Sequence, residues 1–293
     1  MRLFKTKNAL LLEEDERFYF LKEDWDSLVN RKDLFGYLSN LSSKLDNGQL
    51  RKDVLHMLEK ELLPPVGGQE VWAAGVTYQR SREARMEESD ISGGADFYDK
   101  VYEAERPELF FKSLPHRLAG HGQEVYIRKD SSWNVPEPEL TLFINSAGHI
   151  VAYTVGNDMS SRSIEGENPL YLPQAKVYEK SASLGPCLYV PEKIIDPDCI
   201  IEMVIRRNGG IVFSESASIN KMKRSHVELA SYLFRECDFP YGAFLMTGTC
   251  IVPASGFTLQ VNDTVDIRID PIGSLSNWVG YKPGRDNSVA MPI

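Results

Sequence analysis

The sequence predicts a mixed α+β protein in two parts: a small α+β N-terminal domain, residues 1–66, and a larger domain, residues 67–293, made mostly of antiparallel strands. The chain has 293 residues, of which 42% are hydrophobic and 26% charged, so a sizeable core is available. A Pro-Pro-Val-Gly-Gly stretch at positions 64–68 cannot continue a helix and is typical of a linker. Many short β-like runs follow it, and we expect them to close as a sandwich, roll or barrel.

The N-terminal domain is predicted to begin with a hairpin and to continue with helices. Residues 2–21, RLFKTKNALLLEEDERFYFL, are typical of a short hairpin. Helical patterns follow at 25–45 and 50–62, and the second ends where the linker begins. These elements together predict the small α+β unit.

The larger domain alternates strand formers with turn residues. One stretch, residues 223–236, predicts a clear helix, and residues 81–105 predict a helical insertion between strands. The runs that predict strands are 70–78, 108–113, 124–128, 139–145, 149–158, 186–191, 200–209, 210–216 and 263–270. We expect most of these strands to pair antiparallel.

Charge and targeting signals limit the classes of molecule that the protein can be expected to bind. The formal net charge is −9 and no long run of Lys or Arg occurs, which argues against nucleic acid and anionic membranes as partners, because both are bound largely through phosphate groups. The N-terminus lacks a signal-peptide pattern, and no apolar run approaches the ~18 residues needed to span a bilayer. The four cysteines show no CxxC spacing, and the histidines fit no zinc template. We therefore expect a cytoplasmic protein that acts on a small molecule.

Two glutamates open the strand predicted at 139–145, although a strand that enters a core should not carry bare carboxylates. Side chains alternate along a strand, so Glu137 and Glu139 share one face. The turn that follows predicts a hairpin that brings Glu137 beside Asn157 or Asp158. Three clustered carboxylates repel one another unless a divalent cation binds them, and oxygen ligands favour Mg²⁺, Mn²⁺ or Ca²⁺. The alternative is that the glutamates are solvated at a strand start and that Asp158 caps a turn.

Several motifs accompany these carboxylates. GNDMSSR spans 156–162, and Lys176 precedes a Leu-Gly-Pro turn at 184–186. FLMTGTCIVP spans 244–253, and LQVNDTVDIRIDPIGSLSNWV spans 259–279. Together with the Glu-x-Glu strand, these segments resemble the fumarylacetoacetate hydrolase superfamily from Val71 to Val279.

The resemblance implies a catalytic domain with a metal cofactor and a set of site residues. The implied ligands of Mg²⁺, with Mn²⁺ or Ca²⁺ as substitutes, are Glu137, Glu139 and Asp158. Lys176 would lie beside the substrate, and Thr249, with the backbone at Gly248, would hold a substrate carboxylate. Members of the superfamily act on 2-oxo acids or diketones whose oxygens chelate the metal, which stabilises an enolate.

One departure from the superfamily pattern limits the reactions that this site is expected to catalyse. Members that hydrolyse carbon–carbon bonds carry a histidine a few residues after a tyrosine, whereas here Tyr78 is followed by Ser81 and, at the longer spacing, by Glu83. A serine without a partner is a poor base, so we expect this site to bind a polyol acid rather than to activate water. Ser81 and Arg82 are accordingly candidates for substrate binding. The alternative is that Ser81, Arg82 and Arg85 form a solvated helix face.

The segment GVTYQRSREARMEES at 75–89, the insertion after it and GTCIVP resemble the sugar-acid branch of the superfamily. This implies Mg²⁺-dependent dehydration of a 2-keto-3-deoxy sugar acid. Lys176 would take a C3 proton as base, or else stay charged and hydrogen-bond the substrate, while Ser81 or Glu83 would hold or protonate the departing hydroxyl. We also expect a homo-oligomer, a dimer or a tetramer, although no motif specifies the number of subunits.

Two other functions and one structural hypothesis stay open. The same metal centre would serve another carbon–carbon lyase, hydrolase or decarboxylase of 2-oxo acids, and a non-catalytic sugar-acid binding protein would need no lysine at the reacting carbon. Residues 89–105 carry a Gly93-Gly94 pair and are proposed to form a lid over the substrate. The alternative for this segment is an ordinary surface helix or an oligomer contact.

Overall fold

Two β-sheets stacked on one another form the body of the protein, and the computed structural model describes residues 1–45, 48–89 and 95–284 of the chain. The larger sheet has 11 strands. Along the sheet they are β4 (Gln49–Leu50), β3 (Arg17–Leu21), β2 (Leu10–Glu14), β1 (Arg2–Lys5), β13 (Ala182–Tyr189), β11 (Ile150–Asp158), β10 (Pro138–Ile144), β16 (Ala243–Met246), β5 (Glu70–Gly75) and β6 (Glu108–Ser113), with β7 (Leu118–Ala119) beside β13.

The smaller sheet has 5 strands and packs against the middle of the larger one. In order across the sheet they are β15 (Gly210–Ser218), β14 (Ile200–Arg207), β17 (Thr264–Ile269), β18 (Gly273–Tyr281) and β8 (Gln123–Ile127). A separate short ladder joins β9 (Asn134–Val135) to β12 (Ser160–Ser161). Buried side chains such as Leu140, Val155, Met203 and Ile267 fill the space between the two sheets, so the predicted α+β architecture with sandwiched sheets is confirmed.

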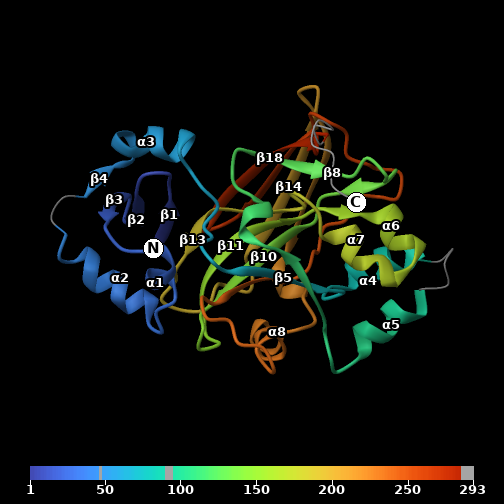
Figure 1. Ribbon diagram of the computed structural model, residues 1–293, viewed down its shortest axis with the longest axis horizontal. Coiled ribbons are helices and arrows are strands. Elements are labelled where there is room, and N and C mark those ends of the chain that lie inside the picture. Colours follow the sequence, from blue (N-terminus) through green and yellow to red (C-terminus); the bar gives the residue numbers. More distant parts are fainter. Residues whose placement is uncertain (46–47, 90–94, 285–293) are drawn as a thin grey trace, which may run out of the picture.

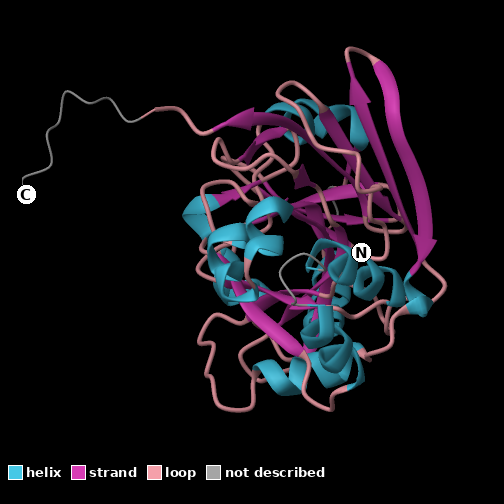
Figure 2. Ribbon diagram, turned by 90° about the vertical axis from the view of Figure 1, so that its right-hand side faces the viewer, coloured by secondary structure: helices cyan, strands magenta, loops and turns pink. Residues whose placement is uncertain are grey.

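Helices lie around the larger sheet, most of them at its two ends. They are α1 (Trp25–Val29), α2 (Leu34–Ser42), α3 (Arg51–Lys60), α4 (Gln79–Ser89), α5 (Ala95–Glu103), α6 (Arg162–Glu167), α7 (Leu172–Lys176) and α8 (His226–Leu233), with 3₁₀ turns at Pro115–Arg117, Pro169–Tyr171 and Ile219–Lys221. In Figure 1, α1, α2 and α3 lie at the N-terminal end, whereas α4, α5, α6 and α7 lie together at the opposite end. Figure 2 looks onto that second group.

Residues 2–21 form three antiparallel strands, β1, β2 and β3, rather than the predicted two-stranded hairpin. The extra turn lies at Asp15 and Glu16, which both adopt positive φ angles, 48° and 62°, and so form a tight reversal between β2 and β3. The clear helix predicted at 223–236 is confirmed as α8. The short helices α6 and α7 were not expected, because too few residues lie between the flanking strands to show a helical period.

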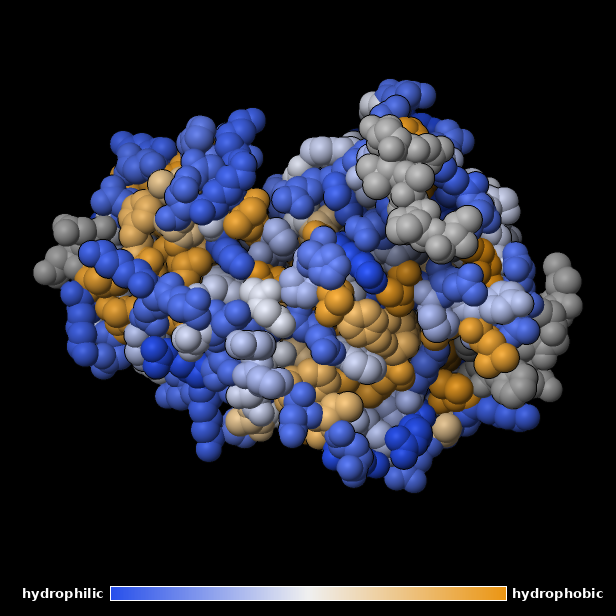
Figure 3. All heavy atoms as spheres, viewed as in Figure 1, coloured by the Kyte–Doolittle hydropathy of each residue, from blue (hydrophilic) through white to orange (hydrophobic). Residues whose placement is uncertain are grey.

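Most strand pairs are antiparallel, as predicted, but three pairs are parallel: β16 with β5, β18 with β8, and β13 with β7. The hairpin of β10 and β11 lies near the centre of the larger sheet, so every residue of β10 is buried. Hydrophilic side chains cover most of the face shown in Figure 3, with apolar atoms gathered near its middle and in its left-hand part. Among the described residues, no helix is long and apolar enough to cross a bilayer.

Candidate active site

Three carboxylates meet at the open end of the hairpin of β10 and β11. Glu139 lies on β10, Asp158 ends β11, and Glu137 immediately precedes β10. The backbone N–H of Asp158 donates to the carbonyl of Glu137 at 2.9 Å, which confirms the pairing predicted from the turn. The three residues are 3%, 2% and 1% exposed, in chain order, and one oxygen of each lies within 4.8 Å of the others. The glutamates are therefore not solvated at a strand start.

Lys176 lies against this cluster at the C-terminal end of α7. The residue is fully buried, and its Nζ donates to Oε2 of Glu137 at 2.5 Å and to Oδ2 of Asp158 at 3.2 Å. Its backbone carbonyl accepts from the hydroxyl of Ser181 at 2.9 Å. The lysine ammonium therefore connects two of the three carboxylates, and the backbone around it is itself held by hydrogen bonds.

A second buried lysine, Lys112 of β6, contacts the other oxygen of Asp158. The distance from its Nζ to Oδ1 of Asp158 is 2.5 Å, and the same Nζ donates to the carbonyls of Met159 and Lys176. Burial lowers the pKa of Lys112 to about 8, against the opposing effect of Asp158. The sequence interpretation missed this residue, which contacts a predicted metal ligand directly.

Glu108 lies on the same face of β6 as Lys112 and was also missed. Its carboxylate covers Gly75 of β5, where an added Cβ would come 2.0 Å from Oε2. That oxygen is buried and has no hydrogen-bond partner among the described residues. Burial raises the pKa of Glu108 above its ordinary value, although the charges of Arg85 and Lys176 oppose this. The alternation of charged residues along an otherwise apolar strand was the signal that could have identified both residues.

The three carboxylates differ in how the protein compensates their charge. Arg162 of α6 donates from Nη2 to Oε1 of Glu137 at 2.8 Å. Burial alone would raise the pKa of Asp158, but the two lysines outweigh it and the pKa lies below its ordinary value. Glu139 accepts from the backbone N–H of Gly248 at 2.6 Å, and burial together with the neighbouring carboxylates raises its pKa well above the ordinary range. Of the three carboxylates, Glu139 is therefore the one whose negative charge its surroundings compensate least.

A small cavity beside the carboxylates contains most of the other predicted site residues. Ser81, Gly248 and Thr249 line it together with Arg85 and Arg162. The hydroxyl of Ser81 donates to the carbonyl of Tyr78 at 2.7 Å, and the hydroxyl of Thr249 donates to the carbonyl of Ile251 at 3.0 Å. Both hydroxyls therefore already hold backbone groups in place at the edge of the cavity.

Arg82 and Glu83 lie outside the residues that line this cavity. Arg82 forms an ion pair with Asp99 of α5, and its side chain is 30% exposed. The side chain of Glu83 is 50% exposed, with its Oε2 3.8 Å from Nη1 of Arg80. On α4, the described residues that reach the cavity are Ser81 and Arg85. The sequence offers Arg85 only as part of a solvated helix face, whereas the residue is 4% exposed.

The insertion proposed as a lid is described in part. Residues 90–94, with the Gly93-Gly94 pair, lie outside the described residues. The C-terminal end of α5 is held by Arg224, whose guanidinium donates to the carbonyls of Val101, Ala104 and Glu105 at 3.2, 2.6 and 3.0 Å. These contacts fix where the insertion ends, and its movement over a substrate stays a prediction.

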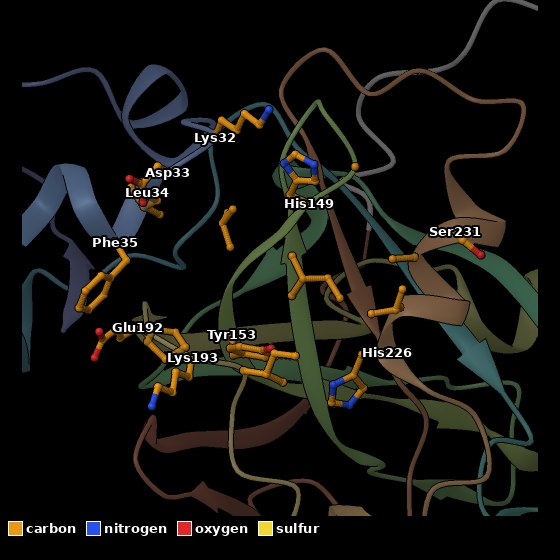
Figure 4. Close-up of a pocket in the computed structure, with 17 residues that line it drawn as sticks. Lys32, Asp33, Leu34, Phe35, His149, Tyr153, Glu192, Lys193, His226 and Ser231 are labelled. Carbon is orange, nitrogen blue, oxygen red and sulfur yellow. The ribbon is translucent and has the colours of Figure 1, made fainter.

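A different pocket lies at the other end of the same hairpin. Figure 4 shows it between the start of α2, the hairpin turn near His149, and α8, with His226 close to Tyr153 on its inner wall. Burial lowers the pKa of His226 to about 4, so this histidine is neutral at pH 7. Its lining contains no grouping of three His, Cys, Asp or Glu side chains like the one at the carboxylate end, within the part of the chain that the structure describes.

The chain is similar to several known proteins along most of its length. The chain is 49% identical over 223 residues to a probable 2-keto-3-deoxyxylonate dehydratase of Haloferax volcanii, covering 76% of each chain. It is 42% identical over 213 residues to a 2-dehydro-3-deoxy-D-arabinonate dehydratase of Saccharolobus solfataricus, covering 72% of each. A solved structure of 2-keto-3-deoxy-D-arabinonate dehydratase complexed with magnesium and 2,5-dioxopentanoate superposes with a TM-score of 0.81 at 33% identity, covering 97% of this chain and 100% of that one.

The carboxylate motif, the lysine motif and the Gly-Thr segment all fall within one matched region. A sequence model described as the C-terminal domain of fumarylacetoacetate (FAA) hydrolase matches residues 71–280, which agrees with the extent expected from the motifs. Because this match covers more than half of the chain and the relatives exceed 40% identity, the protein belongs to the fumarylacetoacetate hydrolase family.

Proposed function

We propose that the protein is a Mg²⁺-dependent dehydratase that converts a 2-keto-3-deoxy pentonate into 2,5-dioxopentanoate and water. The observation that supports this best is the group of three buried carboxylates with a buried lysine between two of them. Two relatives with 42% and 49% identity are named as dehydratases of such acids, and one solved relative holds magnesium and 2,5-dioxopentanoate.

The residues present suit the metal. Glu137, Glu139 and Asp158 offer hard oxygen ligands from one compact cluster, and Glu139 has a raised pKa that a cation would relieve. We infer that these three residues hold Mg²⁺, with Mn²⁺ or Ca²⁺ as substitutes. A bound divalent cation supplies Lewis-acid chemistry, because it polarises the keto group of a 2-oxo acid and stabilises the charge that develops on it.

Lys176 is the residue proposed to move the first proton. Its Nζ contacts two of the proposed ligands, so it lies beside the end of the substrate that those ligands orient. As base it takes a proton from C3, and the electron pair moves into the C2 keto group. The alternative role is a charged lysine that hydrogen-bonds the keto or carboxylate oxygen, which is the commoner use of lysine beside an anion.

Elimination then needs a group that protonates the departing C4 hydroxyl. The C3–C4 double bond forms as the C4–O bond breaks, and the hydroxyl leaves as water when it gains a proton. Glu108 is a candidate because one oxygen of its carboxyl is buried without a described partner and burial raises its pKa above the ordinary value, although it is not among the residues that line the cavity. Ser81 lines the cavity as a second candidate, whereas Glu83 reaches it only if α4 moves. Transfer of a proton from C5 to C3 gives an enol with a C4–C5 double bond, and movement of its O–H proton to C4 completes the conversion to the dioxo acid.

The decisive assay supplies both C4 epimers of 2-keto-3-deoxypentonate with Mg²⁺ and follows substrate and 2,5-dioxopentanoate by NMR. We expect dioxopentanoate from at least one epimer and none in excess chelator. Release of carbon dioxide or of a shorter 2-oxo acid would instead identify a decarboxylase or carbon–carbon lyase of the family. Binding without turnover of any tested acid would identify a sugar-acid binding protein.

A further inference from the structure

A buried ion pair joins α4 to α6 at the edge of the catalytic cavity. The guanidinium of Arg85, on α4, pairs through Nη1 with Oε1 of Glu165, on α6, and the two side chains are 5% and 1% exposed. The other oxygen of Glu165 accepts from the hydroxyl of Ser160 at 3.0 Å. Ser160 lies two residues after Asp158, so this chain of contacts links α4 to the segment that carries a proposed metal ligand.

Placing two charges in a protein interior is costly, and a purely structural contact could be made as well by apolar side chains. A reason to keep the pair is that Arg85 lines the cavity, where its positive charge acts on the carboxyl of Glu108. A guanidinium presents N–H donors on more than one edge, so it can hold more than one acceptor at the same time.

The cations that line the cavity divide into two groups. Lys176 and Arg162 pair directly with proposed metal ligands and so act at the end of the substrate that carries the carboxylate and keto oxygens. Arg85 pairs instead with Glu165, which is not a member of the three-carboxylate group. Ser81, the other α4 residue in the lining, has its hydroxyl bound to the backbone of Tyr78. Among the α4 side chains that the structure describes, Arg85 is thus the charged group that can contact the far end of the substrate.

We infer that Arg85 is a specificity-determining residue that binds the hydroxylated tail of the substrate, and that Glu165 is a positioning residue that aims it. The inference rests on the proposed function for the identity of the substrate. It assigns the selection of a polyol acid over a plain 2-oxo acid to α4, rather than to the metal-binding end. Glu165 acts through Arg85, so its removal weakens tail recognition without altering the metal ligands.

The test compares two unreactive probes that differ by one hydroxyl, 2-oxopentanoate and 5-hydroxy-2-oxopentanoate, in the presence of Mg²⁺. Neither has a C4 hydroxyl to lose, so calorimetry measures affinity without turnover. In Arg85→Gln we expect about tenfold weaker binding of the hydroxylated probe, as for loss of a charge-assisted hydrogen bond, with little change for 2-oxopentanoate. Glu165→Gln should show the same selective loss to a smaller degree, and the double variant should match Arg85→Gln alone because the two residues act as one unit.

Two controls separate this inference from misfolding and from failure of the proposed function. Mn²⁺ affinity and the circular dichroism spectrum should be unchanged in both variants, and Arg80→Gln, on the exposed side of α4, should bind both probes as the wild type does. With the sugar acid itself, KM should rise while kcat stays within about twofold for Glu165→Gln. Equal loss for both probes, no loss for either, or no preference in the wild type would overturn the inference. The binding measurement tests this inference even if the protein turns over no sugar acid, so the two proposals can fail separately.

Discussion

At the scale of single residues, the site is a balance of buried charges. Lys112 and Lys176 hold the two oxygens of Asp158 separately, while Arg162 takes one oxygen of Glu137. Each contact compensates the negative charge of a carboxylate and also fixes its orientation, because a donor at 2.5–3.2 Å restricts rotation of the group. Metal ligands held in this way are preorganised, so less free energy is lost when a cation binds.

The role of Lys176 can be decided by hydrogen exchange. If its amine is the C3 base, Lys176→Met should lose exchange of the C3 hydrogens of the substrate with D₂O by at least about a hundredfold, the usual contribution of general base catalysis. NMR of the substrate under conditions where the variant still binds it measures this directly. Lys129→Met, on an exposed lysine, serves as control. Exchange at the wild-type rate in Lys176→Met would eliminate Lys176 as the C3 base.

His226 makes stability depend on pH. Burial holds its pKa at about 4 in the folded chain, below the unfolded value of roughly 6.5, so the unfolded chain binds a proton more readily between these values. Above pH 6.5 His226 is mostly neutral in both the folded and the unfolded chain. As the pH falls from 6.5 toward 4, the unfolded chain gains a proton that the folded chain does not, so the free energy of unfolding falls. We expect this histidine to account for roughly 2 kcal/mol of lost stability between pH 7 and pH 5.

Urea denaturation at the two pH values measures this loss. His226→Gln should show a smaller fall in unfolding free energy than the wild type over the same interval. His149→Gln, on an exposed histidine of the same pocket, should leave the fall unchanged. A fall in His226→Gln as large as in the wild type would assign the acid sensitivity to other groups.

At the scale of elements, the hairpin of β10 and β11 could be predicted because its information is local. Alternation places Glu137 and Glu139 on one face, and a short turn fixes the register that brings Asp158 beside them. Lys112 could not be placed in the same way. Its strand β6 reaches the site only through β5 and β16, a parallel pairing between segments far apart in sequence that no local pattern specifies.

The glycine of the Gly-Thr segment is expected to be indispensable. Gly248 adopts a φ of +96°, and an added Cβ would come 2.0 Å from Oγ1 of Thr77, which itself donates to the carbonyl of Thr247 at 2.6 Å. Gly248→Ala combines backbone strain with displacement of this contact, so we expect a loss of about 2 kcal/mol or more in unfolding free energy and weaker metal binding through Glu139. Gly256→Ala is the matched control, because nothing lies within 4 Å of its added Cβ. Equal stability of the two variants in urea would contradict this explanation.

At the scale of the whole molecule, metal binding should stabilise the fold. A cation that binds the folded cluster and not the unfolded chain adds about 2.7 kcal/mol when its concentration is a hundred times the dissociation constant. We therefore expect the melting temperature to rise with Mg²⁺ and to fall in excess chelator. Glu139→Gln should lose most of this response while remaining folded, because one of three ligand charges is removed. If Mg²⁺ does not change the melting temperature of the wild type, the carboxylate cluster is not a metal site.

The N-terminal segment is more closely joined to the rest of the protein than a separate small domain would be. Its strand β1 pairs with β13, so residues 1–66 extend the larger sheet. Leu12 and Trp25 belong to the same buried cluster as Phe143 and Phe244 of the central strands. The sequence predicts a linker near residue 66 but not this shared core, because apolar periodicity shows which residues are buried and not against which partners. The boundary and the expected dimer or tetramer stay predictions.

This shared core leads to a prediction about folding. Removal of residues 1–66 would leave the Leu188–Tyr189 end of β13 without its pairing to β1 and expose apolar side chains such as Phe143 and Phe244 that the N-terminal elements help to cover. We expect residues 67–293 alone to aggregate or to lack a cooperative melting transition, whereas the full chain should unfold in a single transition in which calorimetric and van't Hoff enthalpies agree. A second deletion variant, which keeps β1 to β3 and the linker but lacks α2 and α3, tests whether the strands alone suffice. Two separate transitions in the full chain, or a stable and active fragment of residues 67–293, would establish the N-terminal part as an independent domain.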